Sequence, residues 1–77
     1  MNHFEIVYGF VILKITQLGM DGQHLYRVHF PNEVPDITIE CITPAHGETY
    51  WDTVPAGNPE LGASIGKLVT DHLNIAL

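Results

Sequence analysis

The sequence offers almost no means of covalent stabilisation, because Cys41 is the only cysteine among 77 residues. One thiol cannot form a disulfide within the chain, and it cannot supply the cysteine pair of a zinc finger. A chain of this length buries only roughly 60% of the surface that its unfolded form exposes. We therefore expect one small domain over residues 1–77, without a cofactor, whose marginal core is supplemented by self-association.

Basic residues are also scarce. Lys14, Arg27 and Lys67 stand against nine acidic residues, which gives a net charge of −6. A protein that grips nucleic acid by its phosphates needs clustered lysine and arginine, so this composition argues against direct nucleic-acid binding. The acids are scattered along the chain without a block of like charge. That distribution is typical of an acidic, solvated surface.

Long hydrophobic runs are absent as well. The apolar stretch between residues 4 and 15 is interrupted by Glu5 and is shorter than the about 20 residues of a membrane span. The start of the sequence lacks the basic segment of a signal peptide. These features predict a cytoplasmic protein that has no membrane partner. An apolar content of 45% with 16% charged residues indicates an ordered chain rather than a disordered one.

Two apolar runs between Phe4 and Phe30 flank the dipeptide Asp21-Gly22. Asp-Gly between alternating hydrophobics is the strongest short-range hairpin signal, because both central residues of a type I′ turn need a positive φ. A turn at this point sets a register in which Ile15 lies opposite Val28. One face of the hairpin is then apolar and the other is largely polar, as in a sheet that covers a core on one side.

The first apolar run is expected to be one long strand that extends from His3 to about Gln17. A bulge at Gly9 would place the apolar residues before it on the core face. A second group of apolar residues would remain on the outer face with or without this bulge. The members expected on this outer face are Phe10, Ile12, Leu18 and Leu25.

Two further strands are predicted over residues 37–42 and 48–54, each bounded by proline or glycine. Asn58-Pro59-Glu60 has the features of a helix start, with an asparagine cap, proline at the first position and an acid in the first turn. Apolar residues at helical spacing follow on one stripe. The predicted fold class is α+β, with a four-stranded antiparallel sheet followed by one C-terminal helix packed on one face, in the order ββββα.

The ββββα order is similar to that of single-stranded nucleic-acid-binding repeats of the PUR type. The resemblance is one of layout, and it implies pairing of two copies through their helices. Such proteins use a basic sheet to bind nucleic acid, whereas this chain carries three basic residues in total. What the resemblance implies here is therefore dimerisation rather than nucleic-acid binding.

Three helix residues are candidates for a functional surface. Gly62 and Gly66 lie four residues apart, and each costs roughly 1 kcal/mol against alanine in a helix interior. Their retention predicts a flat surface that another backbone approaches, either the sheet or a partner helix. His72 falls near the centre of the apolar stripe. It is either a pocket or pH-sensitive residue, or a partly buried histidine that is hydrogen-bonded to the sheet.

Other chemistry is weakly represented. Cys41 alternates with isoleucines toward the core, which favours a buried structural thiol over a nucleophile. His46 and Glu48 share a turn and could meet a metal ion there, but a third ligand is not evident. Glu40 could approach Glu48 or Asp52 across adjacent strands, as acid–base catalysis would require. No phosphate loop, dinucleotide fingerprint or hydrolase elbow is present, so no catalytic residue is predicted.

These observations favour a non-enzymatic protein-interaction module that acts as a homodimer, because exposed apolar patches on small proteins mark association surfaces. An alternative is a small acidic inhibitor or decoy that binds a basic, nucleic-acid-binding surface of another protein. A third possibility is a small enzyme with a site at a dimer seam. The outer apolar face could serve either a second copy or a different protein.

Overall fold

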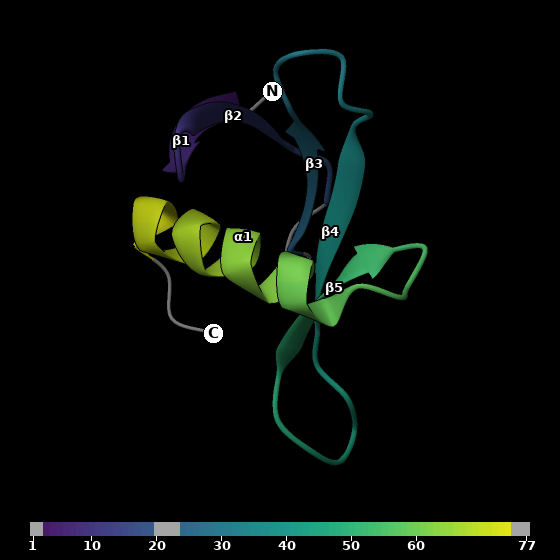
Figure 1. The fold of residues 1–77 in the computed structure, drawn as a ribbon. Coiled ribbons are helices and arrows are strands. Elements are labelled where there is room, and N and C mark those ends of the chain that lie inside the picture. Colours follow the sequence, from purple (N-terminus) through teal and green to yellow (C-terminus); the bar gives the residue numbers. More distant parts are fainter. Residues whose placement is uncertain (1–2, 20–23, 75–77) are drawn as a thin grey trace.

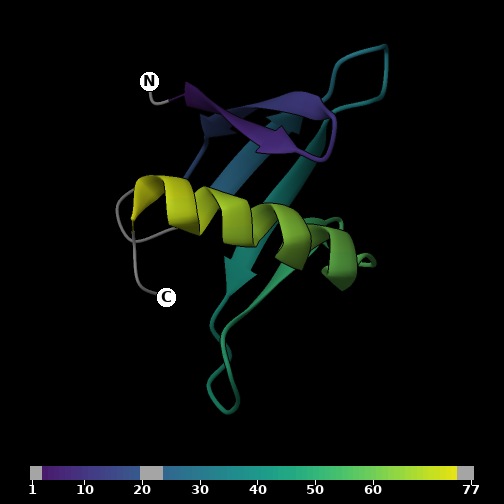
Figure 2. The same cartoon turned by 60° about the vertical axis from the view of Figure 1, so that its left-hand side comes forward.

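The computed structural model describes residues 3–19 and 24–74. In this part of the chain, five strands form an antiparallel sheet and one helix follows them. The elements are β1 (His3–Tyr8), β2 (Val11–Gln17), β3 (Leu25–His29), β4 (Ile37–Ile42), β5 (Tyr50–Val54) and α1 (Pro59–Leu73). Strands that are consecutive in sequence are neighbours in the sheet. The sheet curls, and α1 runs along its concave side (Figure 1, Figure 2). The α+β class, the antiparallel sheet and the C-terminal helix are thus confirmed.

The predicted single strand over residues 3–17 is wrong, because the chain reverses at Gly9-Phe10 and forms two strands there. Tyr8 and Val11 are paired across this turn. Gly9 has a φ of 63°, and Phe10 is not among the residues with positive φ. That combination belongs to a type II′ hairpin turn, which takes glycine at its first central position. The described sheet therefore has five strands instead of the predicted four.

The hairpin still places the apolar side chains of β1 on the face where a bulge would have placed them. Phe4 is paired with Ile15 and Ile6 with Leu13, so these residues share the concave face of the sheet. Residues directly opposite each other in an antiparallel pair project to the same side. Phe10 differs from the prediction in position, since it lies at the tip of the hairpin and not within a strand.

The register predicted for the second hairpin is confirmed. Ile15 lies opposite Val28 in the β2–β3 ladder. The turn predicted at Asp21-Gly22 falls outside the described residues. Of the later strands, β4 coincides with the predicted range 37–42, and β5 begins two residues after the predicted start.

A bulge ends the regular part of the β2–β3 ladder. The backbone N–H groups of Leu18 and Gly19 both donate to the carbonyl oxygen of Leu25, at 2.8 and 3.3 Å. Two residues that oppose one in this way define a β-bulge. A bulge therefore does occur on the first apolar run, but at its far end and not at Gly9.

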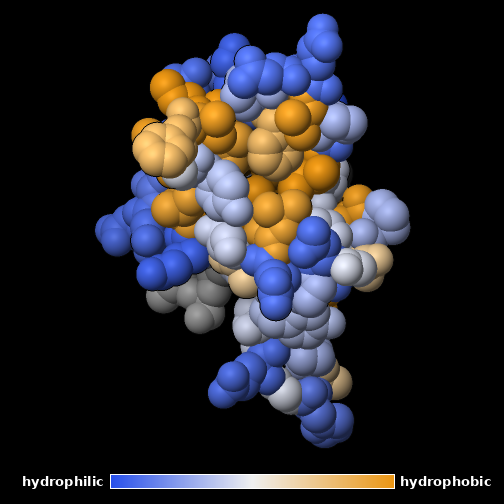
Figure 3. All heavy atoms as spheres, viewed as in Figure 1, coloured by the Kyte–Doolittle hydropathy of each residue, from blue (hydrophilic) through white to orange (hydrophobic). Residues whose placement is uncertain are grey.

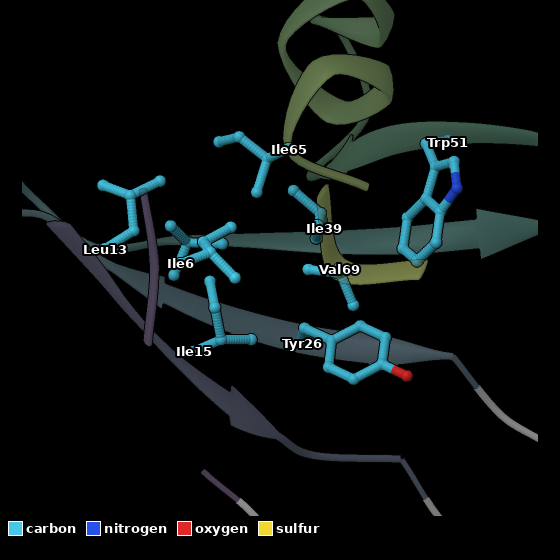
Figure 4. Packing of buried hydrophobic residues seen from close by; sticks show 9 residues of the cluster. Ile6, Leu13, Ile15, Tyr26, Ile39, Trp51, Ile65 and Val69 are labelled. Carbon is cyan, nitrogen blue, oxygen red and sulfur yellow. The ribbon is translucent and has the colours of Figure 1, made fainter. Parts of the chain in front are cut away.

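The core lies between the concave face of the sheet and α1 (Figure 4). Each strand contributes at least one buried apolar side chain, and the helix contributes two. The buried members within the described residues are Ile6, Leu13, Ile15, Tyr26, Val28, Ile39, Trp51, Ile65 and Val69. Residues two apart supply the core from β2 and β3, as the alternating pattern predicts, while β1, β4 and β5 supply one buried apolar side chain each.

The helix begins where the sequence predicts. The side chain of Asn58 accepts a hydrogen bond from the N–H of Leu61 at 3.2 Å, and Pro59 is the first helical residue. At the other end Asn74 adopts a left-handed conformation with a φ of 54°, and its N–H donates to the carbonyl of Asp71 at 3.3 Å. Both ends of α1 are thus capped by asparagine. None of the described residues forms a helix long and apolar enough to cross a membrane.

Candidate functional site

The most exposed apolar side chains lie on the β1–β2 hairpin. Phe10 is 107% exposed, and Val7 and Ile12 are 67% and 56% exposed. Val7 and Ile12 lie directly opposite each other in the ladder, on the convex face that α1 does not cover. We call these three residues the hairpin patch. The space-filling view also shows hydrophobic residues gathered over β1 and β2 (Figure 3).

The structure divides the predicted outer apolar set into two groups. Ile12 belongs to the hairpin patch, whereas Leu18 and Leu25 lie at the opposite end of β2. Lys14 and Thr16 occupy the same face between the two groups. Leu18 is 39% exposed and Leu25 is half-buried. The four residues predicted to form one patch therefore form two groups, and the polar residues Lys14 and Thr16 lie between these groups.

Gly62 and Gly66 are buried against β5 of the same chain. A Cβ atom on Gly62 would lie 2.8 Å from the Cα of Asp52, and a Cβ atom on Gly66 would overlap the ring of Trp51. The two glycines thus let the helix approach the backbone and indole of the neighbouring strand. Of the two alternatives, sheet or partner helix, the sheet is the one observed. This pair is not available as an interface with another molecule.

His72 is exposed, so the expectation of a partly buried histidine near the centre of the apolar stripe is wrong. Its ring stacks on Phe4 of β1, with ring centroids 4.4 Å apart and an interplanar angle of 5°. The contact connects the last turn of α1 to the edge strand. The buried residues of α1 are Gly62, Ile65, Gly66 and Val69, and His72 lies outside this set. A pH-sensitive role for this residue stays a prediction.

Cys41 and Tyr26 lie close together on the concave face. Burial raises the pKa of the Cys41 thiol, and the neighbouring Glu40 carboxylate raises it further. Burial, and after it Cys41, raises the pKa of the Tyr26 hydroxyl, whose side chain is 1% exposed. A thiol with a raised pKa is a poor nucleophile at neutral pH. Cys41 therefore fits the structural reading that the sequence favoured.

These raised pKa values predict a loss of stability at alkaline pH. The unfolded state ionises near the ordinary pKa values of 9.0 for cysteine and 10.0 for tyrosine, while the folded state holds these protons to a higher pH because both pKa values are raised. The unfolded state then binds fewer protons than the native state, so the free energy of unfolding falls as pH rises above about 9. Thermal unfolding at pH 8 and pH 10.5 checks this. The Cys41→Ala variant should lose less stability than the wild type over this interval, and an equal loss would contradict the assignment.

Charge is unevenly divided over the molecule. On and beside the convex face of β1–β3, Lys14 and Arg27 balance Glu5 of β1 and Asp36 of the loop that precedes β4. The Oδ1 of Asp36 lies 2.7 Å from the Nδ1 of His29, also on this side. Without these two acids and two bases, the sequence retains seven acids and one base, so the rest of the chain accounts for the whole net charge of −6. The hairpin patch therefore borders the electrically balanced part of the protein.

The predicted chemical groups do not assemble into a reactive site. His46 and Glu48 are both exposed in the loop between β4 and β5. Among the described residues, no group of three or more histidine, cysteine or acidic side chains could hold a metal ion. Glu40 and Asp52 are direct neighbours across β4 and β5, as the sequence allowed. The Oδ1 of Asp52, however, accepts three hydrogen bonds from backbone N–H groups, the shortest at 2.7 Å, so this carboxylate is committed to the loop before α1.

An open depression of about 330 Å³ lies at β1 and β2. Its volume is near the lower end of the range for small-molecule sites, about 300–1,000 Å³. The residues that line it are His3, Phe4, Glu5, Lys14 and Thr16. Because it borders the edge of β1, a partner on that edge would narrow it. A catalytic site at a dimer seam stays a prediction.

Comparison of the chain with protein-family models, with curated proteins and with solved structures gives no match. The candidate surface is therefore defined from the residues of this chain alone.

Proposed function

We propose that the protein is a non-enzymatic interaction module that acts as a homodimer through the hairpin patch. The observation that carries this proposal is the full exposure of Phe10 at the tip of a hairpin, next to the exposed pair Val7 and Ile12. A large aromatic side chain gains free energy when it leaves water, and aromatic residues dominate the energetics of interfaces. Small proteins that carry a clustered apolar patch commonly bury it against another molecule.

The charge distribution favours a second copy over a different partner. Two molecules that each carry a net charge of −6 repel each other over most of their surface. On the convex side of β1–β3 the charges balance, so two copies can approach there without a net repulsion. A basic partner would instead be attracted to the acidic remainder of the chain. A two-fold pairing is the commonest closed arrangement for identical subunits.

Replacement of Phe10 by glutamate tests the proposal. We expect wild-type protein at micromolar concentration to scatter light as a dimer, at twice the monomer mass of 8.6 kDa. Phe10→Glu should raise the dimer dissociation constant at least about thirtyfold, which corresponds to a loss of about 2 kcal/mol, because the introduced charge must lose its hydration when the partner docks. The fold should be retained, since the side chain of Phe10 is not part of the core.

Tyr50→Glu is the matched control, because Tyr50 is also an exposed aromatic residue, 47% exposed, but lies at the far end of the sheet on β5. This variant should remain a dimer. A wild type with a mass of 8.6 kDa and no concentration dependence would overturn the homodimer. An equal loss of dimer in both variants would mean that the hairpin patch is not the surface involved.

The alternative function is a decoy for a basic surface. The excess of acidic residues favours it, because the chain outside Glu5, Lys14, Arg27 and Asp36 has seven acids and one base. Such binding would weaken steeply as salt concentration rises, because it depends on attraction between opposite charges. Dimerisation through the hairpin patch would change little with salt. Light scattering in 50 mM and 500 mM salt, with and without a basic polypeptide such as polylysine, separates the two functions.

A further inference from the structure

β1 is an edge strand, and its outward-facing backbone groups can be identified. The N–H of Leu18 donates to the carbonyl of Leu25 at 2.8 Å, so Leu18 directs its backbone groups toward β3. In an antiparallel ladder this direction alternates from residue to residue. Every second residue of β2 therefore bonds to β3, and the residues between them, Leu13 and Ile15 among them, bond to β1.

The same alternation continues into β1. Phe4 and Ile6 lie opposite Ile15 and Leu13, so their backbone groups are used within the hairpin. The intervening residues of β1 direct their N–H and C=O groups away from β2, toward the edge of the sheet. These outward-facing residues are His3, Glu5 and Val7. All three have exposed side chains, so nothing in the described part of the chain covers this edge.

We infer that a second copy of the chain docks on this edge, with the two β1 strands antiparallel about a two-fold axis at Val7. This inference rests on the proposed homodimer and specifies its geometry. The pairing joins the hairpin patches of the two copies, because Ile12 and Val7 of one subunit then stand in one row with the partner's Val7 and Ile12. The two sheets join at this point, and the outward-facing N–H and C=O groups of the two Val7 residues gain partners, while those of His3 stay exposed because β1 ends at Tyr8.

Other registers are less favourable for identified reasons. Hydrogen-bonded pairs can form only between outward-facing residues. An axis at His3, or between His3 and Glu5, would leave the two hairpin patches far apart, so the axes to compare lie at Glu5, at Val7 or between them. An axis at Glu5 would place two carboxylates directly opposite each other, which is destabilising. An axis between the two residues would place each Glu5 against the partner's Val7 and separate the two apolar pairs. The axis at Val7 is the one that merges both patches and keeps the acids apart.

Cysteine substitution tests both the edge and the register. Hydrogen-bonded antiparallel neighbours have Cα atoms about 5.5 Å apart, inside the range that a disulfide requires. Val7→Cys should therefore form an intermolecular disulfide rapidly in oxidised glutathione. Glu5→Cys is the matched control: in this register the two copies of residue 5 are offset by four residues, about 13 Å. We expect Val7→Cys to link at least tenfold faster, with the bonded residues identified by mass spectrometry so that links through Cys41 are recognised.

Faster linkage through Glu5→Cys, or no difference between the two variants, would overturn the proposed pairing. Val7→Pro supplies an independent readout. Its N–H is not used within the chain, and proline is tolerated where an edge strand faces solvent, so the circular dichroism spectrum should be unchanged while the dimer is lost. If the wild type is a dimer that Phe10→Glu disrupts, but Val7→Pro remains a dimer, the homodimer stands and the edge pairing fails. A monomeric wild type would overturn both the homodimer and the edge pairing.

Discussion

Replacing Gly66 by alanine is expected to lower the free energy of unfolding by about 2 kcal/mol. The added methyl group would overlap the indole of Trp51, which is buried between the helix and the sheet. Overpacking of this kind costs about 1–3 kcal/mol or more, because the ring and the helix must separate. Alanine gains about 1 kcal/mol in helix propensity over glycine, which offsets part of the loss. Urea unfolding monitored by tryptophan fluorescence measures the difference.

Ser64→Ala is the control for this effect, because Ser64 lies two residues earlier in the helix and its side chain is exposed. This change should alter the free energy of unfolding by less than about 0.5 kcal/mol. A stabilised Gly66→Ala variant would mean that propensity outweighs packing and that the helix does not lie close to β5. The same experiment therefore tests whether the two helix glycines serve the fold, as their contacts indicate, and not a partner.

Features that depend on residues close together in the sequence could be predicted from it. The helix start follows from Asn58-Pro59, because the cap and the fixed φ of proline act within one turn. The β2–β3 register follows from a turn placed at Asp21-Gly22, and the pairing of Ile15 with Val28 confirms that register. Such features need no knowledge of the remaining chain.

The first hairpin was missed because its turn has a weak signature. Gly-Phe is a less specific pair than Asp-Gly, since a type II′ turn requires glycine only at its first central position. An apolar residue at the second position made the run read as one strand. The length of that run, about fifteen residues against a usual strand of 5–6, was the available signal for a second turn.

The exposure of His72 and the division of the outer apolar set depend on long-range packing. A stripe on a helical wheel gives the direction of the apolar side but not the rotation of the helix against the sheet. Close contact of Gly62 and Gly66 with β5 sets that rotation here, and it moves His72 to the rim. Residue parity placed Leu18 and Ile12 on one face, with Leu18 nearer the second turn, and the structure shows Lys14 and Thr16 between them on that face.

The carboxylate of Asp52 is expected to be a second large contributor to stability. Its Oδ1 accepts hydrogen bonds from the N–H groups of Thr53, Gly57 and Asn58 at 2.7, 3.3 and 3.2 Å. The side chain is 9% exposed, which makes Asp52 the buried charged residue of the described chain. It thereby holds the loop that leads from β5 into the helix cap. This role could not be predicted from the sequence, because a carboxylate that accepts hydrogen bonds from residues five and six positions later follows no standard spacing.

Asp52→Ala should therefore lower the free energy of unfolding by about 3 kcal/mol. The substitution leaves three N–H donors without their acceptor, and hydrogen bonds to charged groups contribute about 1.5–3 kcal/mol each, of which water that enters the loop restores a part. Asp52→Asn keeps an oxygen acceptor and should cost only about 1 kcal/mol, while Asp71→Ala on the exposed face of the helix should stay within about 0.5 kcal/mol. Urea unfolding of the three variants gives the ranking. Equal losses for alanine and asparagine would show that the charge of Asp52, and not its three accepted hydrogen bonds, stabilises the start of the helix.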